Sequence, residues 1–146
     1  TMNDKRIYST LTMAGVTPFV PCAILPLAGF SSIGLLGPLA DVAAGYGLAI
    51  ISFLAGIHWA TQIYDRQQTG FNLLIASNVV FVAVWLAYAL GTIEFALGTQ
   101  IVALLVLLGV DRWLLNYGVI TAHYYRTRSA ATILAVLSLG VIVFAP

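Results

Sequence analysis

Residues 72–90, NLLIASNVVFVAVWLAYAL, form an apolar stretch without a charged side chain. A helix needs about 20 predominantly apolar residues to cross the hydrocarbon layer of a membrane. Four more stretches of this kind lie at residues 11–30, 42–63, 95–115 and 129–145. The sequence therefore predicts an all-α integral membrane protein, a single domain that forms a bundle of five transmembrane helices.

The composition of the whole chain supports this fold class. Of its 146 residues, 61% are hydrophobic and 8% are charged, whereas soluble domains carry about 25% charged residues. Six basic and five acidic side chains could not cover the surface of a soluble fold of this length. With a net charge of +1 and no basic patch, the chain is expected to contact the lipid bilayer and other membrane protein subunits, and not nucleic acid.

The basic residues predict the orientation of the bundle. They are Lys5, Arg6, Arg66, Arg112, Arg126 and Arg128. If the five spans alternate in direction, all of these residues fall on one side, the last four at the membrane interface. The opposite connections carry only Asp41 and Glu94. Because cytoplasmic connections are enriched in Lys and Arg, we expect the N-terminus inside and the C-terminus outside.

The first span contains three prolines, Pro18, Pro21 and Pro26. Each lacks a backbone N–H and disfavours a straight helix. We therefore expect this span to be kinked or partly unwound. Either neighbouring helices satisfy the bend, which then has no further role, or the bend provides a gate or a ligand notch.

The second span has two distinct faces. Ser52, Gly56 and Ala60 are spaced by four and form a small-residue stripe, against which another helix could pack closely. A polar stripe lies on a different face of the same helix. Its members are His58, Thr61, Gln62 and Asp65.

Three polar residues are expected at a similar depth in the membrane. At a rise of about 1.5 Å per residue, His58, Asn78 and Asp111 each lie roughly 9 Å below the inner interface. An ionisable group at that depth needs a partner. Asp111 could find one in His58 or Asn78, or in Arg126 and Arg128 reaching in from the loop. The layer is then either a hydrogen-bonded pin between helices or a proton-handling or ligand site.

The sequence requires no cofactor but leaves several open. The two histidines, His58 and His123, could serve as axial ligands of a haem, or one of them could hold a pigment. His123 is expected in the loop before the last span, beside interfacial tyrosines. The chain has no phosphate loop, no metal-ligand cluster and no nucleophile paired with a base, so nothing supports an enzyme.

Residues 53–59, FLAGIHW, resemble the small-residue and His-Trp signature of an uncharacterised five-span membrane family. This family, a domain of unknown function, includes eukaryotic transmembrane protein sixty-nine. The resemblance extends to GVTPF at residues 15–19, Asp111, and YRTR at residues 125–128. It implies a bacterial inner membrane or its mitochondrial equivalent, and it supplies no activity.

Three functional hypotheses follow. The first is an accessory or assembly subunit of a larger energy-transducing membrane complex, which the short loops and the spare packing face favour. The second is a protein that binds a haem, quinone, pigment or lipid-like ligand among its helices near His58 and Asp111. The third is a small proton-coupled transporter in which the same two residues titrate.

Overall fold

The computed structural model describes residues 2–64 and 72–144, and in this part of the chain the prediction of five apolar helical spans is confirmed. Each span is long and apolar enough to cross a membrane. The spans are Asp4–Leu27, Leu39–Tyr64, Leu73–Leu90, Ile93–Asn116 and Ala122–Phe144.

The first span is divided by the predicted break. It consists of α1 (Met2–Val16) and α2 (Phe19–Leu27), and the residues between them are Thr17 and Pro18. Since Pro18 has no N–H, it cannot continue the hydrogen-bond ladder of α1. The other two prolines do not break the helix. Pro21 lies in the first turn of α2, where N–H groups have no helical partner, and Pro26 lies in its last turn.

Tyr46 of α3 fastens this break to the rest of the bundle. Its hydroxyl donates a hydrogen bond of 2.5 Å to the carbonyl oxygen of Gly15, near the end of α1. Its ring packs edge-on against Phe19 at 5.1 Å between centroids. The bend is therefore satisfied by a neighbouring helix.

A short hairpin connects the first span to α3. Strands β1 (Ser32–Ile33) and β2 (Gly37–Pro38) pair antiparallel around the 3-10 turn η1 (Gly34–Leu36). Gly37 has φ 88°, a left-handed conformation that glycine adopts without strain. The sequence predicted only a loop with breakers at this position.

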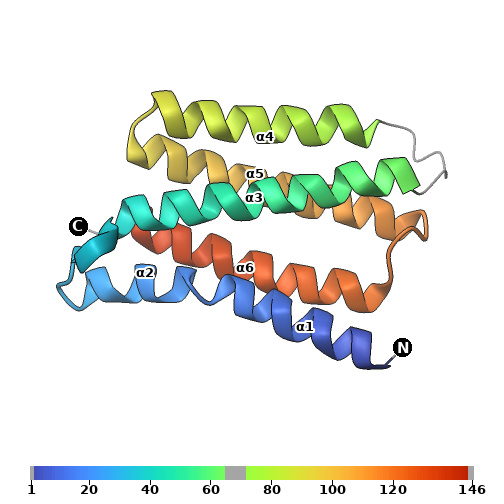
Figure 1. Cartoon of the computed structure of the whole chain (residues 1–146), viewed down its shortest axis with the longest axis horizontal. Coiled ribbons are helices and arrows are strands. Elements are labelled where there is room, and N and C mark those ends of the chain that lie inside the picture. The colour runs from blue at the N-terminus through green and yellow to red at the C-terminus, as the bar shows by residue number, and fades with distance from the viewer. Residues whose placement is uncertain (1, 65–71, 145–146) are drawn as a thin grey trace.

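The remaining helices are α3 (Leu39–Tyr64), α4 (Leu73–Leu90), α5 (Ile93–Asn116) and α6 (Ala122–Phe144). Consecutive helices are antiparallel neighbours, as predicted, and α3 also packs on α5 (Figure 1). The first span covers α6, with α2 packed against both α3 and α6 and α1 packed on α6. The two termini lie at opposite ends of the bundle (Figure 1).

The last helix begins earlier than the sequence predicted. The prediction placed the start of the span at residue 129, but α6 begins at Ala122, where the Thr121 hydroxyl accepts a hydrogen bond from the Tyr124 N–H. His123, Arg126 and Arg128 therefore lie on the helix, and their predicted place in a loop is wrong. The error arose because the first two turns are polar and aromatic, so an apolarity criterion leaves them out.

Candidate functional site

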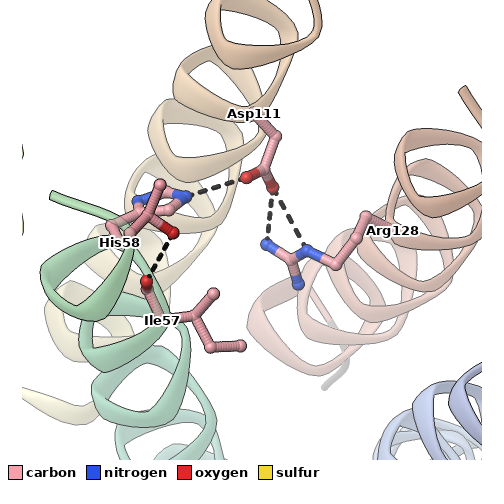
Figure 2. A network of polar contacts seen from close by, with 5 residues as sticks. Ile57, His58, Asp111 and Arg128 are labelled. Atoms are coloured by element: carbon pink, nitrogen blue, oxygen red, sulfur yellow. Dashed lines mark hydrogen bonds and ion pairs between the residues drawn. The ribbon is translucent and has the colours of Figure 1, made fainter. Parts of the chain in front are cut away.

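Asp111 of α5 joins three helices through its carboxylate (Figure 2). His58 Nε2, on α3, lies 2.8 Å from Oδ1, and the imidazole must donate this hydrogen bond because an ionised carboxylate can only accept. Arg128, on α6, donates to Oδ2 from Nε at 3.1 Å and from Nη2 at 2.9 Å. Both oxygens of Asp111 therefore have charged or polar partners.

The three side chains are almost completely buried, and together they are called the triad below. Their exposed fractions are 1% for Asp111, 3% for His58 and 6% for Arg128. Removing such groups from water is costly unless they are paired and hydrogen-bonded. Asp111 and Arg128 carry opposite formal charges and balance each other. It is a fixed polar centre inside an apolar bundle.

The helix starts explain how Arg128 reaches this position. Arg128 lies six residues after Ala122, the first residue of α6, which corresponds to a rise of about 9 Å. His58 precedes Tyr64, the last residue of α3, by the same number of positions. The sequence predicted a similar depth for His58 and Asp111, and these two residues do contact each other. Arg128 is a third partner. Arg128 is buried between the helices of the bundle, and its place at the membrane interface stays a prediction.

Two other candidates from the sequence lie elsewhere. Asn78 is exposed on α4, where its side-chain amide donates to the Leu74 carbonyl of its own helix at 2.7 Å. Gln62 Oε1 accepts a hydrogen bond from the Leu73 N–H at 3.0 Å, so it caps the start of α4. Neither of these hydrogen bonds involves Asp111. Asp65 and Arg66 lie outside the described residues.

The end of the bundle that carries the N-terminus is polar and aromatic, as expected for the basic residues there. Arg112 and Arg126 are exposed, and the Arg112 guanidinium lies 5.7 Å from the centre of the Tyr125 ring. His123 is also exposed, and its Nε2 lies 3.0 Å from the Ser9 hydroxyl on α1. His58 and His123 have different partners on different helices, so this geometry does not favour them as a haem-ligand pair. Among the described residues, no group of three His, Cys, Asp or Glu side chains is placed to hold a metal.

A cavity of about 130 Å³ lies next to the triad, between α1, α2, α3, α5 and α6. Arg128 lines it, as do Tyr8 and Thr12 from α1 and Thr132 from α6. The remaining lining is apolar. It consists of Leu11, Gly15, Val16, Phe19, Ile50, Phe53, Leu54, Ile57, Leu104, Ala131 and Ala135.

The cavity opens on the side of the bundle. Leu11 of α1 and Phe53 of α3 line it and are 66% and 68% exposed. In the first span, α1 packs on α6, whereas α2 packs on both α3 and α6. The helices that carry Leu11 and Phe53, α1 and α3, therefore diverge toward the N-terminal end of the bundle (Figure 1). The kink at Pro18 is thus what separates α1 from α3.

Sequence reasoning expected Tyr8 and Tyr124 at the inner interface but missed their contact, and it missed Gln100 altogether. Tyr8 and Tyr124 stack with ring centroids 4.8 Å apart and hold α1 against α6 beside the triad. Gln100, fully buried on α5, donates to the Ala44 carbonyl of α3 at 2.7 Å. Two signals in the sequence could have identified Gln100. It is a single amide in an apolar span, and Gly47 leaves room for its side chain.

The small-residue stripe of α3 is not covered by another helix of the described chain at its centre. Gly56 is exposed, and a Cβ placed there would meet no atom within 4 Å. Ser52 and Ala60 are half-buried. Their role in packing against a partner stays a prediction.

The chain matches a known protein family over nearly its whole length. The model of the family described as "Protein of unknown function (DUF3429)" matches residues 5–144. The chain belongs to this family. The match includes all three triad residues and nearly the whole chain, as the resemblance predicted, whereas the relation to transmembrane protein sixty-nine stays a prediction. No curated protein and no solved structure gives a significant match.

Proposed function

We propose that this protein spans a membrane with its N-terminus in the cytoplasm and binds a lipid-soluble ligand in the cavity beside Arg128. The orientation is supported by the cations near the N-terminal end of the bundle, since cytoplasmic connections are enriched in Lys and Arg. The family resemblance implies a bacterial inner membrane or its mitochondrial equivalent as the location.

The observation that carries the proposal is the composition of the cavity wall. Most of the lining is apolar, and a buried guanidinium and two hydroxyl-bearing residues of α1 gather at one end. Ligand sites are typically apolar with a few convergent polar groups that fix the orientation of the ligand. A molecule with an apolar body and a polar head matches this wall.

The open side supports entry from the membrane. If the bundle is embedded, Leu11 and Phe53 face lipid, so an apolar molecule could enter between α1 and α3 without passing through water. We prefer this function to proton-coupled transport because both oxygens of Asp111 are engaged by buried partners.

Filling the cavity tests the proposal. Ala131 lines the cavity and Ala130, its neighbour on α6, is exposed, so Ala131→Phe blocks the cavity and Ala130→Phe is a matched control. Each protein is purified in mild detergent, and co-purifying lipid-soluble molecules are identified by solvent extraction and mass spectrometry. We expect a molecule bound near stoichiometry in the parent and in Ala130→Phe, and lost in Ala131→Phe. Identical extracts from all three proteins would contradict the proposal.

The uncovered small-residue face favours a second candidate, an accessory subunit that packs a partner helix at Gly56. Gly56→Leu would then shift the protein from a larger complex to a smaller one on a native gel of membrane extracts. If the parent already migrates as a monomer in gentle detergent, this second function is excluded.

A further inference from the structure

The polar groups at the head of the cavity can all donate hydrogen bonds. Arg128 can only donate, and the one guanidinium nitrogen that does not bond Asp111, Nη1, is directed away from the carboxylate (Figure 2). The hydroxyl oxygen of Tyr8 is buried and makes no hydrogen bond of standard geometry among the described residues, and the hydroxyl groups of Thr12 and Tyr124 are its polar neighbours. An occupant that presents acceptors would satisfy these groups.

The charge of the site favours a neutral head group. Asp111 already balances Arg128, at 2.9 Å between Oδ2 and Nη2. An anionic head would therefore bring an uncompensated negative charge into an apolar surrounding, which is costly. A carbonyl oxygen accepts from the same donors without that cost.

The size of the cavity favours a single ring. Its volume, about 130 Å³, is close to the roughly 150 Å³ of an engineered apolar cavity that binds benzene. A longer apolar part of the ligand would extend out of the cavity between the exposed side chains of Leu11 and Phe53.

Building on the proposed function, we infer that the ligand is a quinone-type molecule. Its ring occupies the cavity, one carbonyl oxygen accepts hydrogen bonds from Arg128 and the Tyr8 hydroxyl, and its apolar tail extends into the bilayer between α1 and α3. The inference concerns binding and orientation of the ring.

Three probes with the same tail separate the quinone from its alternatives. A benzoquinone with a decyl tail, decylbenzene and undecanoic acid are titrated into the full-length protein, and occupancy is measured by native mass spectrometry. Tyr8→Phe removes the hydroxyl but retains the ring that stacks on Tyr124. Tyr117→Phe, on an exposed tyrosine, is the matched control.

We expect the quinone to bind most tightly of the three. Tyr8→Phe should weaken quinone binding about three- to tenfold, the range for one hydrogen bond, and should leave decylbenzene unchanged. Tighter binding of undecanoic acid, or quinone binding that is insensitive to Tyr8→Phe, would overturn the inference while the cavity remains a ligand site. If Ala131→Phe left the binding of every probe unchanged, the proposed function would fail as well.

Discussion

At the scale of single residues, the triad places three paired polar side chains inside an apolar bundle. Asp111 uses both carboxylate oxygens, one for His58 and one for Arg128. The loss of one member of a buried ion pair costs more than the pair contributes, because the remaining charge stays buried without a partner. This asymmetry makes the triad testable by substitution.

Asp111→Leu should lower the free energy of unfolding by about 3–5 kcal/mol, because it leaves the Arg128 guanidinium buried and unpaired. Denaturant unfolding in detergent, followed by circular dichroism, measures this change. The double variant Asp111→Leu/Arg128→Met removes both charges and should recover most of the loss. If the double variant were as unstable as the sum of the two single variants, the pairing would be refuted.

Two glycines of α3 offer a matched pair. A Cβ at Gly47 would overlap the side-chain amide of Gln100, whereas a Cβ at Gly56 meets no atom within 4 Å. Gly47→Ala should therefore destabilise the protein by about 1–3 kcal/mol through overpacking. Gly56→Ala should be neutral or stabilising by up to about 1 kcal/mol, the difference in helix propensity. Equal thermal midpoints for the two variants would show that Gln100 is not packed against Gly47.

At the scale of helices, the break between α1 and α2 creates the cavity. Pro18 interrupts the ladder, and Tyr46 then supplies the hydrogen bond that the Gly15 carbonyl needs. Sequence alone predicted the bend, because three prolines in one span are a strong signal. It could not predict the cavity, which depends on the packing of α1, α3 and α6.

Tyr46→Phe should destabilise the bundle by about 1–3 kcal/mol, because it leaves the Gly15 carbonyl without its partner. Tyr88→Phe, on a tyrosine that is 41% exposed on α4, is the control and should be near neutral. Thermal unfolding in detergent compares the two variants. If Tyr46→Phe were as stable as its control, Tyr46 would not be what fastens the kink.

At the scale of the whole molecule, apolarity predicted the five spans, and counting residues predicted the contact between His58 and Asp111. Counting failed for Asn78, because depth along a helix does not determine the direction in which a side chain points. On α4 the neighbouring Ser77 is buried and Asn78 faces outward. The sequence named Arg128 only as one of several candidate partners of Asp111 and assigned it to a loop, because its helix begins with polar residues. The fold was needed to select it from the others.

The proposed orientation predicts opposite labelling at the two ends of the bundle. In intact cells, a membrane-impermeant maleimide should label Ser32→Cys, in the hairpin, and should not label Arg126→Cys until the membrane is opened. The background is a Cys22→Ala protein, since Cys22 is the natural cysteine. Labelling of Arg126→Cys in intact cells, with Ser32→Cys protected, would reverse the orientation.

Photo-crosslinking tests the central claim, a ligand held in the cavity beside the triad. A benzoquinone with a decyl tail and a photoreactive diazirine on its ring is irradiated with the protein in lipid bilayers, and the labelled peptides are identified by mass spectrometry. We predict adducts on the cavity wall, at residues 11–16 of α1 and 131–135 of α6, and competition by unlabelled quinone. Adducts spread over the exposed face of α4, without competition, would contradict the account.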